Sequence, residues 1–183
     1  RDHDRGSVFG MTSLLPAGST PIVIDDQAQV EQILRSHFGY GIEECHRALE
    51  AGHARAALAT DNSAVSQFGS DFYFGVVEQL RADLARYRYK AFRYRGLELA
   101  RRRDNRLQVT TCMATDGAGE VSGEPNPKNP KGSSSRKAIH NNQGSLGMLA
   151  PGEAWDPIET WWHLYQLHGD SHSRSITGEV SLP

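Results

Sequence analysis

A basic segment offers the clearest chemistry in this 183-residue chain. Ten Lys or Arg residues against three acids lie between residues 81 and 106, although the formal net charge of the whole chain is −2. Four of the arginines recur every seven residues: Arg81, Arg88, Arg95 and Arg102. Aromatic residues are interleaved with them: Tyr87, Tyr89, Phe92 and Tyr94. Such a segment can contact phosphates and stack on bases, and the alternative is a merely solvated basic surface.

The residues predicted to contact RNA or DNA form two groups. The first lies in this basic segment and comprises Arg81, Arg88, Arg95, Arg101, Arg102 and Arg103. The second lies in a downstream stretch rich in Gly, Ser, Asn and Pro, and comprises Lys128, Lys131, Arg136 and Lys137. The alternative for the second group is a flexible, solvated loop. Binding through such contacts weakens steeply with salt.

Other reactive residues lack the spacing that chemistry requires. His163 and His168 are five residues apart, which places them on different faces of a helix. His172 lies beyond Gly169, the residue at which that helix is predicted to end. No Gly-rich phosphate loop, GxSxG, HExxH or zinc-spaced Cys pair is present. Cys45 and Cys112 read as buried thiols in a reducing compartment. We therefore expect no metal and no cofactor, assign no catalytic residue and favour a non-enzymatic role.

The basic segment is predicted to belong to one long amphipathic helix over residues 70–104. Its apolar stripe follows spacings of four and three residues: Tyr73, Val77, Leu80, Leu84, Tyr87, Ala91 and Tyr94. Ser70 can cap the start of this helix. The prediction places the arginine stripe on its outer side.

Three short helices are predicted before it, behind a loose arm at residues 1–20 and an extended segment at residues 21–24. The first helix begins at the caps Asp25 or Asp26 and ends at Gly39. The second covers residues 42–51 and ends at Gly52, and the third covers residues 53–60. None is long enough to be stable alone, so we expect them to pack together.

Residues 27–60 resemble a ubiquitin-associated (UBA) domain of the kind that also opens elongation factor Ts. The resemblance rests on Phe38-Gly39-Tyr40 followed, seven residues later, by Ala48-Leu49. It implies a three-helix unit whose loop at Phe38, Gly39 and Tyr40 docks a protein partner, ubiquitin-like in the family. The alternative is that Phe38 and Tyr40 fill the core.

Residues 106–113 alternate in polarity and predict a strand. Residues 116–147 read as a long loop. A closing helix is predicted from the Asp156-Pro157-x-Glu159 capping pattern to Gly169, followed by a polar tail. Its adjacent Trp161 and Trp162 point to different faces, so the element must be enclosed on two sides or present one tryptophan to a protein partner.

A more distant resemblance is to ADP-ribosyltransferase toxins, which carry an ordered Arg, Ser and Glu. Phe92-Arg93-Tyr94-Arg95-Gly96, Ser133–Ser135 and Glu153 follow that order. In that family the Arg leaves a strand, whereas the pattern here predicts a helix at this position. This reading is a remote alternative.

Together these features predict a mainly α protein with minor β structure. Its parts are an arm (1–20), a helical domain (21–114), a basic loop (115–150) and a C-terminal helix with tail (151–183). A fraction of 38% hydrophobic residues is ordinary for a globular protein, and no apolar run could span a bilayer. We expect an intracellular interaction module that binds a protein partner, with RNA or DNA binding as the alternative. The chain begins at Arg1, a processed terminus being one reading.

Overall fold

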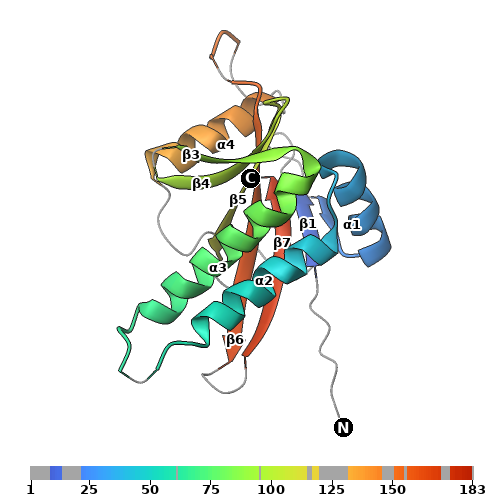
Figure 1. Ribbon diagram of the computed structural model, residues 1–183. Helices are drawn as coiled ribbons and strands as arrows, with labels where there is room; N and C mark the ends of the chain where they lie inside the picture. The colour runs from blue at the N-terminus through green and yellow to red at the C-terminus, as the bar shows by residue number, and fades with distance from the viewer. Residues whose placement is uncertain are drawn as a thin grey trace.

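The chain folds around a mixed seven-stranded β-sheet, as the computed structural model in Figure 1 shows. The structure describes residues 9–13, 22–60, 62–94, 96–114, 117–119, 132–145, 151–154, 156–169 and 174–182. The strands are β1 (Phe9–Ser13), β2 (Ile22–Ile24), β3 (Tyr89–Tyr94), β4 (Leu97–Arg102), β5 (Leu107–Met113), β6 (Glu159–Gly169) and β7 (Arg174–Leu182). Their order across the sheet is β2-β1-β7-β6-β5-β4-β3. The β1–β7 and β5–β6 pairs are parallel and the others are antiparallel.

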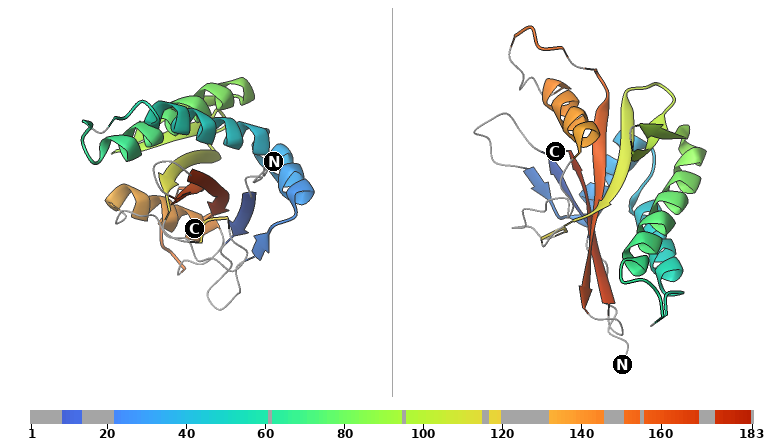
Figure 2. Two further views of the ribbon diagram at one scale, coloured as in Figure 1. Left: turned by 90° about the horizontal axis from the view of Figure 1, so that it is seen from below. Right: turned by 90° about the vertical axis from the view of Figure 1, so that its left-hand side faces the viewer.

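Helices cover both faces of this sheet. They are α1 (Gln27–Ile33), the π-helical turn η1 (Leu34–Phe38), α2 (Ile42–Ala56), α3 (Gln67–Leu84), the 3₁₀ turn η2 (Ala85–Tyr87) and α4 (Ser133–Ser145). The antiparallel pair α2 and α3 lies on one face, and α4 lies on the other (Figure 2). We call these the helical-pair face and the α4 face.

The helical-pair face carries the main hydrophobic core. Alternate residues of the central strand β6 point toward it, among them Trp161 and Tyr165, while Trp162 and Leu164 point to the α4 face. Both tryptophans are buried. A strand buried on both faces reads as a continuous apolar run, which explains the sequence Trp-Trp-His-Leu-Tyr. The expected enclosure of the tryptophans on two sides is therefore found, but in a strand.

The mainly α fold class is wrong, and the long helix at residues 70–104 is the principal error. Helix α3 ends at Leu84, and Arg88 adopts a left-handed backbone (φ 68°) that turns the chain into β3. Tyr94 pairs with Leu97 across an antiparallel hairpin, and Gly96, just before Leu97, adopts φ 88°. Glycine in a helix interior costs about 1 kcal/mol relative to Ala, so Gly96 itself disfavours a continuous helix here.

The predicted C-terminal helix and polar tail are also wrong. Residues 159–169 form β6 and residues 174–182 form β7, which pair with each other as an antiparallel hairpin. The Asp-Pro-x-Glu pattern precedes a strand because aromatic and β-branched residues fit a doubly covered pleated surface. The predicted loop at residues 116–147 contains α4.

Several predictions that concern short segments are confirmed, and one is wrong. The extended segment is β2, residues 107–113 form β5, and Asp26 caps α1 by accepting a hydrogen bond from Gln29 N at 2.7 Å. Gly39 ends η1 in the left-handed conformation (φ 84°). The break predicted at Gly52 is wrong, because α2 runs through it. A Cβ at Gly52 would lie 2.8 Å from the carbonyl oxygen of Phe72, so this glycine permits close approach of α3.

A buried carboxylate holds the loop between η1 and α2. Glu44 accepts hydrogen bonds from Gly41 N and Tyr87 Oη, both at 2.8 Å, and forms ion pairs with Arg35 and Arg47. Burial alone raises the pKa of Glu44, but the Gly41 and Tyr87 hydrogen bonds and the Arg35 charge outweigh it and lower that pKa. The carboxylate thus ties the η1 loop to the turn that opens β3.

Within the described residues, no helix combines the length and apolar character that crossing a bilayer demands.

Candidate nucleic-acid interface

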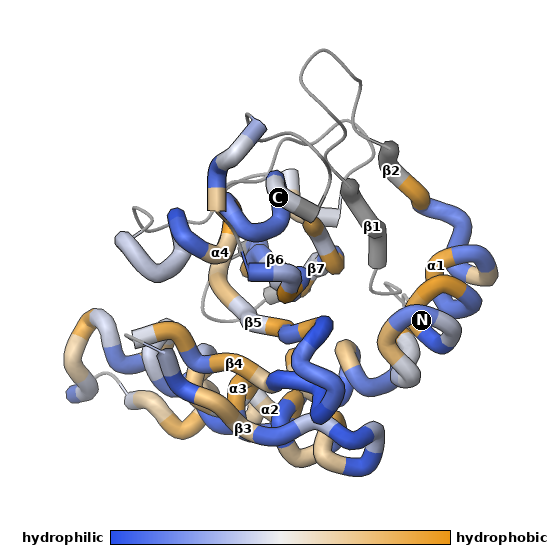
Figure 3. Tube along the Cα trace, turned by 90° about the horizontal axis from the view of Figure 1, so that it is seen from above, coloured by the Kyte–Doolittle hydropathy of each residue, from blue (hydrophilic) through white to orange (hydrophobic). Residues whose placement is uncertain are grey.

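Cationic side chains gather at one end of the β3–β4 hairpin. Lys90 pairs with Arg101 across the strands, Tyr89 pairs with Arg102, and Arg103 N donates to Arg88 O at 3.0 Å. We use the name basic cluster for Arg88, Lys90, Arg101, Arg102, Arg103 and Arg106. In Figure 3 hydrophobic and hydrophilic residues are mixed along the hairpin, and a hydrophilic stretch marks the turn after it. Cross-strand pairing, rather than a helical stripe, thus brings these residues together.

Several members of the basic cluster form no ion pair with a described carboxylate, although the charge of Arg106 acts on Asp104, whose Oδ1 accepts from Arg106 N at 3.0 Å. Among the described residues, no carboxylate lies within ion-pair distance of these four exposed members: Arg88, Lys90, Arg103 and Arg106. By contrast, Glu98 neutralises Arg81 and Arg93 through contacts of 2.8 and 3.0 Å. The chain as a whole is slightly acidic, whereas this end of the hairpin carries a local excess of positive charge.

The guanidinium of Arg101 lies over an aromatic ring. Its guanidinium carbon lies 3.8 Å from the ring centroid of Phe92, and its Nε donates to Gln108 Oε1 at 3.0 Å. Gln108 in turn donates to the hydroxyl of Thr160 at 2.8 Å. Partial burial lowers the pKa of Arg101 from its usual value, but the group remains cationic at neutral pH. A fixed guanidinium plane of this kind can stack on a nucleic-acid base.

Part of the second predicted group lies on α4. Arg136 and Lys137 are exposed, and Lys137 Nζ lies 3.5 Å from a carboxylate oxygen of Asp156. Asp156 also acts electrostatically on Arg101. Asp156 therefore lies between Lys137 of α4 and Arg101 of the basic cluster, on the α4 face of the sheet. Lys128, Lys131 and Arg95 lie outside the described residues.

Next to the basic cluster, His37 contacts a glutamate from the far end of the chain. His37 Nε2 lies 3.1 Å from Glu159 Oε2, and the same oxygen accepts a hydrogen bond from Trp161 Nε1 at 3.2 Å. The His37 hydrogen bond lowers the pKa of Glu159; burial opposes it, and the Trp161 bond and the Arg102 charge reinforce it. Arg102 Nη1 donates to His37 O at 2.7 Å, and Glu159 N donates to Arg106 O at 2.9 Å. These two hydrogen bonds join the His37–Glu159 pair to two members of the basic cluster, Arg102 at the end of β4 and Arg106 just before β5.

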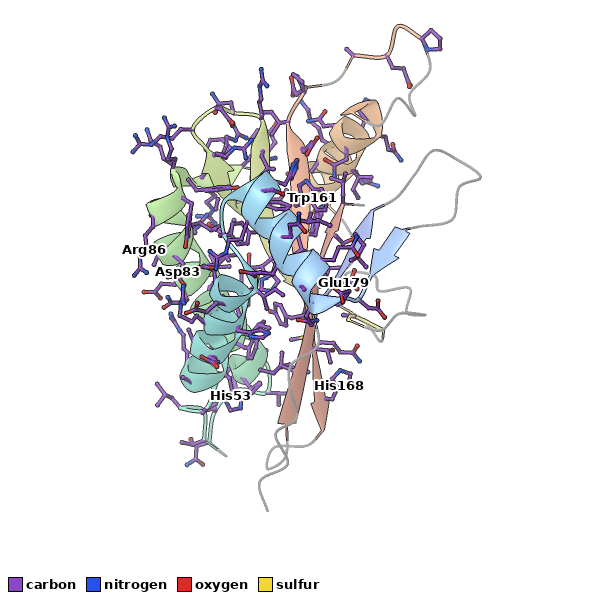
Figure 4. All side chains as sticks on the ribbon, turned by 90° about the vertical axis from the view of Figure 1, so that its right-hand side faces the viewer. His53, Asp83, Arg86, Trp161, His168 and Glu179 are labelled. Atoms are coloured by element: carbon purple, nitrogen blue, oxygen red, sulfur yellow. The ribbon has the colours of Figure 1, made fainter. Side chains whose placement is uncertain are left out.

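His37 occupies an unusual backbone setting. It lies in η1, a π-helical turn, and π-helical bulges occur frequently at functional sites. Its ring packs edge-on against Phe38 and Trp161, with centroid distances of 4.9 and 5.7 Å. Figure 4 places Trp161 beside the helix of residues 27–38, with Arg86 projecting outward from the end of α3.

The predicted protein-binding residues lie mainly in the interior. Phe38 and Tyr40 are 1% and 0% exposed, and Trp161 packs on Phe38 with ring centroids 5.0 Å apart. Trp162 is buried on the α4 face. The backbone of Gly39 is exposed. Docking of a ubiquitin-like partner on this loop stays a prediction, to be tested by titration with ubiquitin.

The residues of the ADP-ribosyltransferase resemblance are distributed over separate elements. Arg93 lies on β3 and pairs with Glu98, so the helix that the sequence predicted at this arginine is absent. Ser133–Ser135 open α4, where Ser134 and Ser135 are buried. Glu153 is exposed in the turn before β6.

Four residues of this region were missed from the sequence. Lys90 and Arg106 fall outside the seven-residue arginine spacing, and only the local charge density indicated them. His37 and Glu159 are 122 residues apart, and no spacing rule connects them. The whole chain matches no protein-family model, no curated protein and no solved structure in the three comparisons made.

Proposed function

We propose that the protein binds single-stranded nucleic acid at the basic cluster. The observation that carries this proposal is the grouping of Arg88, Lys90, Arg103 and Arg106 at one end of a hairpin, exposed and in no ion pair with a described carboxylate. Structural arginines are normally neutralised by neighbouring carboxylates, as Arg81 is by Glu98. Cations without such partners favour a polyanionic ligand.

Two further features favour a single strand over a duplex or a lipid surface. The guanidinium of Arg101, supported by Phe92, offers a planar surface on which an unpaired base can stack. Lys90 lies on an edge strand, because β3 ends the sheet, and the other cations surround the same end of the hairpin. A group of charges near a stacking surface suits a backbone with splayed bases. Anionic vesicles would require no stacking plane, so they serve as the competing outcome.

The test is the fluorescence anisotropy of a labelled twelve-nucleotide single strand, RNA and DNA in parallel, titrated with the full chain. Four phosphate contacts predict that log K falls with log salt with a slope of about −3, or roughly 50-fold between 50 and 200 mM salt. The double variant K90A/R103A should reduce that slope to about −1.5.

The matched control is Arg55→Ala. Arg55 is a half-exposed arginine on α2, outside the basic cluster, where it pairs with Glu78 at 2.9 Å. The R55A variant should bind the oligonucleotides like the wild type. Absence of oligonucleotide binding at low salt, or equal loss in R55A and K90A/R103A, would overturn the proposal. So would binding to phosphatidylserine vesicles but not to oligonucleotides.

A further inference from the structure

We propose that His37 and Glu159 form a general-base site that cleaves RNA held on the basic cluster. The inference rests on the proposed function, since it takes the bound polymer as its substrate. It adds a reaction to that binding and restricts the substrate to strands with a ribose 2′-hydroxyl.

The first requirement is an accessible histidine whose orientation is fixed. The His37 side chain is 43% exposed and that of Glu159 is 33% exposed, so both border solvent. With Nε2–H donating to Glu159, the ring leaves Nδ1 as the unprotonated nitrogen. A base oriented by a third group is the arrangement found in nucleophile-activating sites. His163, by comparison, is fully buried and cannot meet a polymer.

The second requirement is a carboxylate that stays ionised. Glu159 Oε2 accepts from both His37 and Trp161, which fixes its position on β6. An ionised Glu159 stabilises the imidazolium that forms when His37 takes a proton. It also favours the tautomer described above. Glu159 is therefore a positioning residue and His37 the catalytic one.

The third requirement is a cation at the phosphate. Arg102 uses Nη1 on the His37 carbonyl and Nε on Asp104, at 2.7 and 2.9 Å, which holds the guanidinium beside the histidine. Arg106 adjoins Glu159 through its carbonyl, and the side chain of Arg106 is exposed. A phosphodiester bound by these groups lies next to His37. Asp104 pairs with Arg102 at 2.9 Å, so Arg102 offers hydrogen-bond donors, and the exposed Arg106 supplies the charge that stabilises the extra negative charge on the phosphoryl oxygens.

These groups support one balanced reaction. His37 Nδ1 removes the proton of a ribose 2′-hydroxyl, and the 2′ oxygen bonds to the adjacent phosphorus. The bond from phosphorus to the 5′ oxygen breaks, and that oxygen takes a proton from water. His37 returns its proton to the resulting hydroxide. The products are a 2′,3′-cyclic phosphate and a 5′-hydroxyl, and DNA, which lacks the attacking group, is bound without being cut.

The test follows a 5′-labelled twelve-nucleotide RNA on a denaturing gel, beside the same sequence as DNA and as DNA with one ribonucleotide. The wild type should cut the RNA and cut the chimera only after its ribonucleotide. His37→Gln should slow cleavage by roughly 100-fold or more while binding, measured by anisotropy, stays within about twofold. The control His53→Gln, an exposed histidine on α2, should cut like the wild type.

Glu159→Gln provides a separate readout for the positioning role. The amide can still accept from Trp161, so folding should persist, but the negative charge that orients the His37 ring is lost. Cleavage at saturating RNA should therefore slow by about tenfold or more while the anisotropy Kd stays within about twofold, a split that a merely structural role would not produce. Intact RNA despite measured binding, or equal cleavage by wild type and H37Q, would overturn the inference and leave the proposed function standing. Absence of both binding and cleavage would overturn both.

Discussion

The side chain of Asn142, on α4, pairs with the backbone of Thr160 at the start of β6. Its Oδ1 accepts from Thr160 N and its Nδ2 donates to Thr160 O, both at 2.7 Å. Thr160 lies beyond the last described β6–β7 pair, Trp162 with Ser181. The amide therefore replaces the backbone groups of a neighbouring strand. One side chain thus fastens α4 to the sheet.

Replacing Asn142 with Ala should lower the free energy of unfolding by about 2–4 kcal/mol. Both Thr160 backbone groups are buried and would lose their partner, and each unsatisfied group costs about 1–3 kcal/mol. The measurement is urea unfolding followed by tryptophan fluorescence. Gln143→Ala, a half-buried neighbour on the same helix, is the control and should change stability by less than about 1 kcal/mol. Equal effects for the two variants would contradict the role assigned to Asn142.

Two glycines of α3 should respond in opposite directions to alanine. A Cβ at Gly75 would lie 2.8 Å from both the Ala51 carbonyl oxygen and Gly52 Cα, so Gly75→Ala should destabilise by about 1–3 kcal/mol through overpacking. Gly69 has open space around its Cβ position, so Gly69→Ala should stabilise by up to about 1 kcal/mol through helix propensity. Thermal unfolding by circular dichroism compares them. A stable G75A protein would contradict the close α2–α3 crossing.

Stability should decline in mild acid because of His163. Burial, assisted by the charge of His46, lowers the pKa of His163 to about 4, against an ordinary value of 6.5. Between these pH values the unfolded chain binds a proton that the folded chain does not, so stability falls as the pH drops from 6.5 to 4. The loss should approach about 3 kcal/mol.

The comparison variant for this pH effect is His163→Phe, which keeps an aromatic ring in the core. Its unfolding free energy should vary less over the same pH range, as measured by urea denaturation at half-unit pH intervals. Parallel pH curves for the two proteins would show that other groups cause the acid sensitivity.

Arg101→Lys separates stacking from charge in nucleic-acid binding. Lysine keeps the positive charge but lacks the plane that lies 3.8 Å from the Phe92 centroid. The affinity for a single strand should fall by several-fold while the salt dependence stays nearly constant, because stacking contributes about 1–3 kcal/mol per base. Anisotropy titrations at three salt concentrations measure both quantities. An unchanged affinity would assign Arg101 a structural role only.

The sequence by itself determined features that depend on a few neighbouring residues. Asp26 caps α1 and Gly39 ends η1 because each conformation is set within one turn of chain. The alternation in polarity at residues 106–113 predicted the strand β5, because successive side chains of a strand point to opposite faces. The local excess of cations at residues 81–106 was likewise visible in the sequence.

Only the tertiary structure decided whether residues 85–104 and 159–169 would follow the helical period of 3.6 residues or the strand period of two. Their aromatic residues suit a helical stripe as well as a sheet, and helix propensities differ by less than about 1 kcal/mol per residue. Burying Tyr89 or Trp161 on the sheet contributes more than that difference, so long-range packing selected the strands. The same packing brought His37 to Glu159, because η1 packs on Trp161 of β6 and no local spacing relates the two residues.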